Sequence, residues 1–291
     1  MFARPQNEQP TGSAPSRWAK LPISLRAIVS GLFLAIISLN VWPVLLVILP
    51  MPLAASAEAA FLVSFLWWAG GGGPPYSTKS DRAASFRSGK LSVMRWVWGL
   101  CAALFFAVTI HASIVLLFRF VPFPVATFRN GYDLSFIHSQ FLKWTAILIS
   151  AVSAGICEEI GFRGYMQQPI EQRNGVVPAV LISSLFFMAV HLTKAWATLG
   201  MIPIVFGAGL LLGLLAWSAR SLLPGIIGHI MMDIGLFAYW WTGIAGEFSA
   251  RTIRQTGMDR PFLMAFFTFA VSLGIVVFAI YKLQRMRPIT T

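Results

Sequence analysis

Near the middle of the chain, residues 156–166 read Ile156-Cys157-Glu158-Glu159-Ile160-Gly161-Phe162-Arg163-Gly164-Tyr165-Met166. This stretch closes an apolar run that begins near Phe141. A single charged carboxylate at the centre of a membrane helix costs about 2.5–3.5 kcal/mol on insertion scales. Two adjacent glutamates at the end of such a run therefore indicate a polar cavity, a buried partner or a chemical role.

The composition identifies the class of protein. The chain is 57% hydrophobic and only 11% charged, its mean hydropathy is +0.74, and several apolar runs approach the length of about 20 residues that crosses a bilayer. This predicts an all-α, polytopic membrane helical bundle. The two cysteines, Cys101 and Cys157, form no CxxC pair and indicate neither a disulfide framework nor a zinc-binding cysteine motif.

About eight transmembrane helices are predicted from the apolar runs. They cover Ala27–Leu49, Leu53–Ala69, Trp96–Phe118, Phe141–Cys157, Val176–Leu192, Met201–Trp217, Leu222–Trp241 and Phe262–Tyr281. We expect a disordered tail over residues 1–26, a membrane-embedded helical domain over 27–281 with its catalytic core at 141–241, and a basic tail over 282–291. Ala55-Ser56-Ala57 resembles a signal-peptidase site, but the apolar run before it is too long for a signal peptide, which favours a membrane span.

The net charge of +12 raises the question of nucleic-acid binding. The distribution of the charges argues against nucleic acid as a partner, because Lys and Arg punctuate the ends of the apolar runs. With eight spans, 15 of the 22 basic residues fall on the side that holds both termini and seven on the other side. The positive-inside rule then predicts that both termini are cytoplasmic.

Histidines on other apolar runs are candidate partners for the two glutamates. His191 closes the fifth run, and His229 lies four residues before Asp233 in the seventh, so His229 and Asp233 share a helix face. Glu159 and Arg163 have the same spacing, and an ion pair between them would offset part of the cost of burial. Glu158 projects about 100° around the helix from Glu159, which predicts different roles for the two acids.

The spacing also predicts that these residues lie at one depth. Glu158 and His191 are symmetrically placed about Asn174-Gly175, a strong turn signal. His229 lies on the order of 10 Å into its span at 1.5 Å per residue. We therefore expect Glu158, His191 and His229 to meet in one cavity, which would open towards the cytoplasm.

Three motifs on separate apolar runs resemble those of one family. Glu-Glu-x-x-x-Arg (Glu158, Glu159, Arg163), Phe-x-x-x-His (Phe187, His191) and His-x-x-x-Asn/Asp (His229, Asp233) are similar to the motifs of the CAAX prenyl endopeptidase and bacteriocin-processing family, the CPBP or ABI intramembrane proteases. The resemblance covers about Phe141–Trp241 and implies a helical endopeptidase that cuts a membrane-associated protein or peptide.

The resemblance also implies a role for each motif residue. Glu158 and His191 would activate a water, with Glu158 as general base, while His229 and residue 233 would stabilise the oxyanion. Glu159 and Arg163 would hold the site together. This chain has Asp233 where Asn is frequent, and because an ionised Asp repels an oxyanion, we expect Asp233 to orient His229 instead.

Two alternatives remain open at this point. Glu158, His191, His229 and Asp233 form a set of two histidines and two carboxylates that could bind zinc. The same groups could instead form a proton or ion relay in a transporter or a non-catalytic membrane-binding protein. No other cofactor is predicted.

The remaining buried polar candidates receive structural interpretations. We expect His111 to serve packing and Glu58 to lie near a membrane boundary, and nothing in the sequence places a histidine beside Cys157 to make it a nucleophile. Compact loops favour the plasma membrane of a prokaryote, with membrane lipid as the surroundings. The natural substrate does not follow from the sequence.

Overall fold

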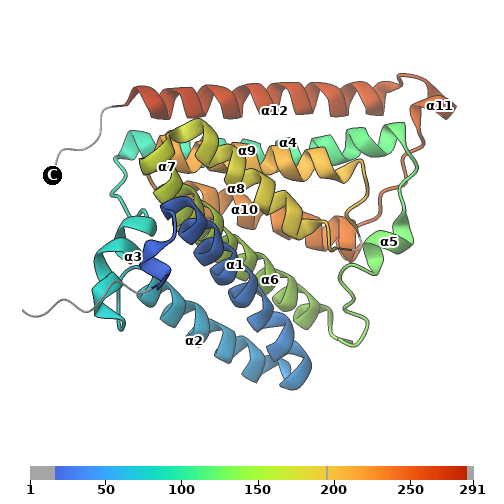
Figure 1. The fold of residues 1–291 in the computed structure, drawn as a ribbon. Coiled ribbons are helices and arrows are strands. Elements are labelled where there is room, and N and C mark those ends of the chain that lie inside the picture. The colour runs from blue at the N-terminus through green and yellow to red at the C-terminus, as the bar shows by residue number, and fades with distance from the viewer. Residues whose placement is uncertain (1–16, 195, 287–291) are drawn as a thin grey trace, which may run out of the picture.

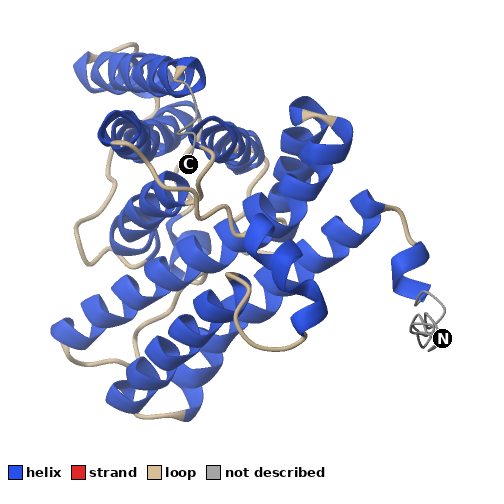
Figure 2. Cartoon of the chain, turned by 90° about the vertical axis from the view of Figure 1, so that its left-hand side faces the viewer, coloured by secondary structure: helices blue, strands red, loops and turns tan. Residues whose placement is uncertain are grey.

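A computed structural model describes residues 17–194 and 196–286 of the chain. The first 16 residues of the predicted N-terminal tail and residues 287–291 of the predicted C-terminal tail lie outside the described residues. Helices joined by loops make up the described part, and no strand occurs in it (Figure 2). This confirms the all-α prediction.

Twelve α-helices and two π-helical segments follow one another along the described chain. They are α1 (Ile23–Ile48), α2 (Met51–Ala69), α3 (Lys79–Ser85), α4 (Val93–Phe120), α5 (Val125–Arg129), α6 (Gln140–Glu158), the π-helix η3 (Glu159–Gln167), α7 (Gln168–Asn174), α8 (Val176–His191), α9 (Met201–Ala219), α10 (Leu223–Gly235), the π-helix η4 (Leu236–Trp241), α11 (Ile253–Thr256) and α12 (Arg260–Arg285). Short 3-10 turns at Arg17–Lys20 and Tyr76–Thr78 complete the described elements.

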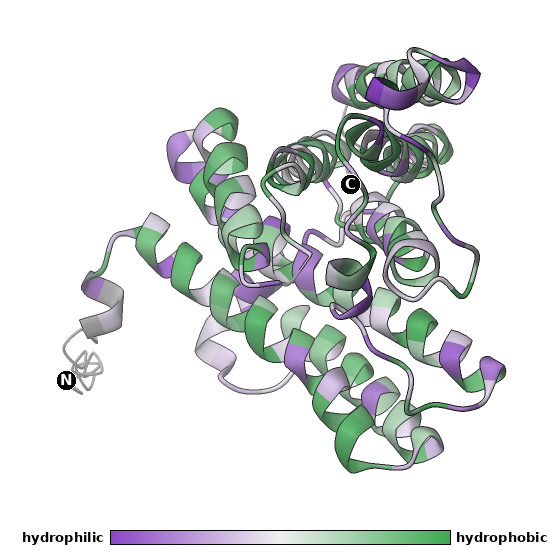
Figure 3. Ribbon diagram, turned by 90° about the vertical axis from the view of Figure 1, so that its right-hand side faces the viewer, coloured by the Kyte–Doolittle hydropathy of each residue, from purple (hydrophilic) through white to green (hydrophobic). Residues whose placement is uncertain are grey.

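The eight predicted membrane spans correspond to helices of the described chain. Seven helical segments are long and apolar enough to cross a bilayer, and α8, at the place of the fifth predicted span, is apolar but shorter. Most of the length of the long helices is hydrophobic (Figure 3). One difference concerns the fourth span, because α6, η3 and α7 continue as a single segment of 35 residues, Gln140–Asn174. The turn after it depends on Gly175, whose φ of 87° favours glycine.

The two ends of the bundle carry different loops (Figure 1). One end, which we call the α3 face, holds α3, the α7–α8 turn and the Arg220–Leu222 connection. The other end, the α5 face, holds α5, α11 and the loop between α8 and α9. The described chain enters α1 and leaves α12 at the α3 face, as an even number of spans requires.

The helices that carry the motifs form the interior of the bundle. Burial inside the protein reaches 72% for the most hydrophobic part of Gln140–Asn174 and 56% for Leu223–Trp241, against 22% for α1, α2 and α12. α12 lies along α4 on one side, α10 packs between α4 and α6, and α1 crosses η3 on the other side. The motif residues are therefore surrounded by protein rather than by lipid.

A close crossing of α1 with η3 fixes the position of the first motif. A Cβ atom added to Gly31 would lie 2.7 Å from the Gly161 carbonyl oxygen, and one added to Gly161 would lie 2.9 Å from the Gly31 carbonyl oxygen. Small residues of this kind allow membrane helices to approach closely. Gly161 thus ties the segment after the two glutamates to the outer helix α1.

Candidate active site

A change of helix type occurs between the two glutamates. Glu158 is the last residue of α6 and Glu159 is the first residue of the π-helix η3. π-Helical turns are rare and occur frequently at functional sites. Both carboxylates are buried, with exposed fractions of 6% for Glu158 and 0% for Glu159, yet they face different partners.

Glu158 faces the two histidines. Its Oε2 lies 3.9 Å from Nε2 of His191 and 3.8 Å from Nε2 of His229. Both distances exceed a hydrogen bond, and this buried oxygen has no hydrogen-bond partner within the described residues. The spacing fits a single water that contacts all three atoms, because a polar separation beyond 3.5 Å is commonly bridged by water. The structure thus brings together the three groups that the sequence predicts to converge.

The Phe-x-x-x-His motif has a clear geometric basis in α8. His191 Nδ1 lies 2.7 Å from the carbonyl oxygen of Phe187, one helical turn earlier, so Nδ1 is the donor and Nε2 is turned towards Glu158. The ring of Phe187 packs on the His191 ring at 4.6 Å and on the guanidinium of Arg163 at 4.4 Å. Phe187 thereby links the first motif to the second.

Glu159 forms short contacts on the other side of the segment. Its Oε1 accepts from Arg163 at 2.9 Å and from His229 Nδ1 at 2.9 Å. Arg163 is fully buried and also donates to the carbonyl oxygen of Gly209 at 3.2 Å. These charge-assisted hydrogen bonds fix the His229 ring with Nε2 directed at Glu158.

Asp233 lies on the Nε2 side of His229 rather than behind it. Its Oδ2 is 3.7 Å from Nε2, on the neighbouring turn of α10. In this geometry the hydrogen bond that orients His229 comes from Glu159, whereas the sequence suggested Asp233 for that role. Asp233 instead faces the space that Glu158 and the two imidazoles share.

A cavity of about 560 Å³ ends at this cluster. Its buried lining includes Glu158, His229 and Asp233, and its exposed lining includes Asn40, Thr193 and Lys194. Thr193 and Lys194 belong to the α5 face, and Asn40 belongs to the half of α1 nearer that face. The sequence predicts an opening towards the cytoplasm, at the end of the bundle that holds the Asn174–Gly175 turn. The exposed lining lies at the opposite end instead.

Below the cluster, the α3-face side is filled by side chains at intervals of four residues. We call Glu159, Arg163, Gln167 and Glu171 the polar column. Gln167 is fully buried and donates to the Gly213 carbonyl oxygen at 2.9 Å and to Glu171 at 3.3 Å. Gln167 and Glu171 are not among the site residues that the sequence predicts. Their spacing of four residues, continued from Glu159 and Arg163, was the available signal.

The polar column is closed at the α3 face by a residue from a distant loop. Arg87 donates to Glu171 at 2.6 Å and to the Ala216 carbonyl oxygen at 3.3 Å. Gly213 permits this packing, because a Cβ atom at its position would lie 2.9 Å from Gln167 Oε1. Hydrogen bonds from Arg163 and Gln167 to carbonyl groups of α9 thus join the fourth span to the sixth, and Arg87 adds one from the loop before α4.

Glu58, which the sequence predicts near a membrane boundary, is buried in α2 with 1% exposure. Its Oε1 accepts a hydrogen bond of 2.7 Å from Ser153, a residue that lines the cavity. The hydropathy of α2 does not reveal which face of the helix meets α6, so this burial could not be predicted from the sequence. Glu58 supports the cavity wall from outside and does not contact the histidines.

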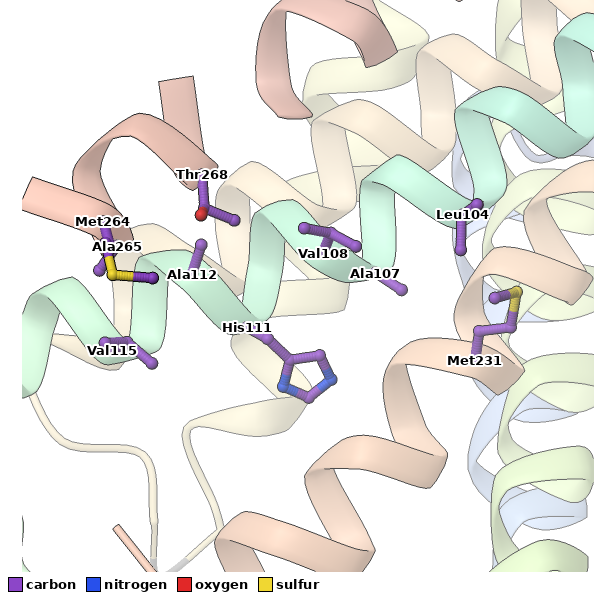
Figure 4. Close-up of a pocket in the computed structure, with 10 residues that line it drawn as sticks. All are labelled: Leu104, Ala107, Val108, His111, Ala112, Val115, Met231, Met264, Ala265 and Thr268. Atoms are coloured by element: carbon purple, nitrogen blue, oxygen red, sulfur yellow. The ribbon is translucent and has the colours of Figure 1, made fainter. Parts of the chain in front are cut away.

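A second hollow, of about 510 Å³, lies between α4, α10 and α12 around His111 (Figure 4). His111 Nε2 lies 3.1 Å from the Met232 carbonyl oxygen, and its Nδ1 accepts from Trp240 Nε1 at 3.1 Å. Both ring nitrogens are engaged and the rest of the lining is almost entirely apolar. His111 is thus a packing residue, in agreement with the sequence analysis.

The four possible zinc ligands, Glu158, His191, His229 and Asp233, all line the cavity. In residues 17–194 and 196–286, no group of three His, Cys, Asp or Glu side chains has the spacing of a metal site. The donor types are nonetheless those that zinc accepts, with both Nδ1 atoms engaged and both Nε2 atoms turned inward.

Comparison with known proteins locates the same region. No match to the chain was found among the curated proteins or the solved structures. Residues 140–235, however, match the family described as "Type II CAAX prenyl endopeptidase Rce1-like". This interval contains all three motifs and every residue of the Glu158 cluster. The match supports a CPBP/CAAX protease assignment for this region, and proteases of this family act on membrane-associated proteins. The candidate membrane spans make the chain an integral, multi-pass membrane protein.

Proposed function

We propose that the protein hydrolyses a peptide bond of a membrane-associated protein or peptide with a water that Glu158 and His191 activate. Glu158 accepts a proton from the water, and the oxygen attacks the scissile carbonyl carbon. The C–N bond then breaks, and Glu158 returns the proton to the leaving amine. General acid–base catalysis of this kind contributes about 10²–10⁴-fold to a rate.

The observation that carries the proposal is the environment of Glu158 Oε2. This oxygen is buried, has no hydrogen-bond partner in the described part of the chain and lies within 3.9 Å of two imidazole nitrogens at the inner end of a cavity. Burying such an atom without a partner is unfavourable, by about 1–3 kcal/mol or more for a charged group. A site for water and substrate accounts for its retention.

His229 stabilises the oxyanion of the tetrahedral intermediate in this proposal. Its Nε2 must donate a hydrogen bond at that step, so the ring must then carry protons on both nitrogens. Glu159 supports this state through its 2.9 Å contact with Nδ1, and Arg163 holds Glu159 in place. Asp233, 3.7 Å from Nε2, supplies a further carboxyl group beside the donor.

The test is cleavage by the purified full-length protein in lipid vesicles. The probe is a reporter peptide joined to a membrane anchor, taken from a library of varied sequences because the natural substrate is unknown. Glu158→Gln and His191→Ala should abolish cleavage. His138→Ala and Glu247→Gln are matched controls on exposed loop residues and should cleave normally. Cleavage that persists in both site variants would refute the assignment.

Metal removal separates the two versions of the mechanism. We propose the version without metal, since the four candidate ligands lack the spacing of a metal site. Activity should then survive complete chelation and dialysis. Loss of cleavage that added zinc restores would instead establish a zinc enzyme with ligands among Glu158, His191, His229 and Asp233.

A further inference from the structure

We infer that the substrate reaches the cavity from the non-cytoplasmic side of the membrane, so that the cleaved bond belongs to a membrane-anchored polypeptide exposed on that side. The substrate named here rests on the proposed function, whereas the side from which the cavity is reached does not. Three independent features carry it: the mouth of the cavity, the closure below the cluster and the distribution of charge.

The mouth of the cavity lies at the α5 face. The exposed lining residues are Thr193 and Lys194 in the loop after α8, Gly131 in the loop before α6, and Ile36, Asn40 and Pro43 on α1. Each belongs to an α5-face loop or to the half of α1 nearer that face. The α1 residues also open the cavity sideways, where a chain anchored in the bilayer can lie against it.

The opposite route, from the α3 face, is closed by packed side chains. Arg163 and Gln167 have no exposed surface, and both donate to carbonyl oxygens of α9. Arg87 and Glu171 form an ion pair of 2.6 Å at the end of the polar column. A peptide could reach Glu158 from this side only by breaking a series of buried hydrogen bonds.

The charge distribution assigns the two faces to sides of the membrane. Lys79, Arg82, Arg87, Lys90 and Arg95 follow one another at the α3 face, between α2 and the first turn of α4. The loops of the α5 face have fewer basic residues for a greater combined length. The positive-inside rule therefore places the α3 face in the cytoplasm and the mouth of the cavity on the other side.

Thiol labelling of intact cells that express the full-length protein tests this inference. Cys101→Ser removes the partly exposed native cysteine, while the fully buried Cys157 is kept. In that background, Thr193→Cys marks the mouth, Val190→Cys the interior and Lys90→Cys the α3 face, with Met258→Cys and Ser80→Cys as second exposed markers of the two faces. The probe is a membrane-impermeant maleimide.

We expect complete labelling at positions 193, 190 and 258 before permeabilisation, and labelling at positions 90 and 80 only afterwards. The reverse pattern, labelling of both faces before permeabilisation, or protection of position 190 from the outside would each overturn the inference. Labelling does not require catalysis and should be unchanged by Glu158→Gln. The labelling experiment therefore tests the side of access, and the vesicle assay tests the protease activity. Either prediction can fail without the other.

Discussion

The two adjacent glutamates of the first motif face opposite halves of the membrane domain and differ in how they are held there. Towards the α3 face, Glu159 accepts two hydrogen bonds of 2.9 Å, and the polar column below it is bonded to α9. Towards the α5 face, its neighbour Glu158 makes only contacts of 3.8 and 3.9 Å, and a cavity begins there. Adjacent glutamates on one segment therefore belong to two different environments.

Burial alone does not identify the reactive group of this pair. Glu159 is more deeply buried than Glu158, but its 2.9 Å contact with His229 Nδ1 gives it a structural role, because it fixes the orientation of that ring. Glu158 lines a cavity and makes only the 3.8 and 3.9 Å contacts with the histidines. Glu159 Oε2 also lacks a hydrogen-bond partner in the described structure, but its Oε1 accepts two hydrogen bonds. In a medium without water, structural polar groups must find protein partners, so a carboxylate that lines a cavity and has no close protein partner is the stronger candidate for chemistry.

The largest expected effect comes from removing the general base. Glu158→Gln keeps the shape of the side chain but cannot accept the proton from water, so cleavage should fall by about 10²–10⁴-fold. Initial rates on the anchored reporter peptide, with protein amounts matched, measure the loss.

Thermal unfolding of the same variant in detergent provides its control. Because Glu158 Oε2 has no hydrogen-bond partner in the described structure, Glu158→Gln should leave the unfolding temperature nearly unchanged or raise it. A strongly destabilised variant would mean that Glu158, like Glu159, has a structural role, and the contrast between the two halves would be lost.

The second effect is on stability and concerns the polar column. Arg163→Ala leaves Glu159 charged, fully buried and without its main partner, which should destabilise the protein by about 3–5 kcal/mol. Equilibrium unfolding in mixed detergent, with the free energy of unfolding as the readout, measures the change.

Arg129→Ala is the matched control for Arg163→Ala. Arg129 pairs with Glu247 at 3.5 Å, and Glu247 is 79% exposed, so this pair should contribute only about 0–1 kcal/mol. Equal effects of the two substitutions would show that the polar column does not hold the α3-face half together.

Much of this contrast was visible in the sequence, because the two acids of the first motif lie about 100° apart on a helix. Periodicity and charge spacing predicted the helical spans, the Asn174–Gly175 turn and the meeting of Glu158, His191 and His229. Each of these depends on local chemistry or on chain lengths, which a sequence displays directly.

The direction in which the cavity opens could not be predicted from spacing. The spacing of residues gives the depth of each one along its helix. It does not show at which end of the bundle the neighbouring helices move apart and leave a cavity. The opening depends on how Gln167 meets α9 and on the packing of α1 against Gly161. For the same reason, the partner that orients His229 was assigned to Asp233, four residues away, rather than to Glu159 on another helix.

The third effect should appear at the mouth of the cavity. Thr193→Trp places a large ring at an exposed lining position and should lower kcat/KM by at least about tenfold, or about 1.4 kcal/mol, mainly through KM. Steady-state kinetics on the anchored reporter measures it. Lys90→Trp on the α3 face is the matched control and should cleave normally, whereas a comparable loss there would indicate access from the closed half.

The smallest effect is expected at Asp233, the residue that departs from the family pattern. Asp233→Asn keeps the shape, removes a carboxylate beside the reacting atoms and adds an amide that can donate to an oxyanion. Cleavage should therefore change by less than about tenfold, or about 1.4 kcal/mol, in either direction, as measured by initial rates at matched protein amounts. A loss as large as that of Glu158→Gln would require the carboxylate itself, as a metal ligand or a proton acceptor. In that case, the open half of the site would contain two essential acids, and the mechanism based on Glu158 alone would be wrong.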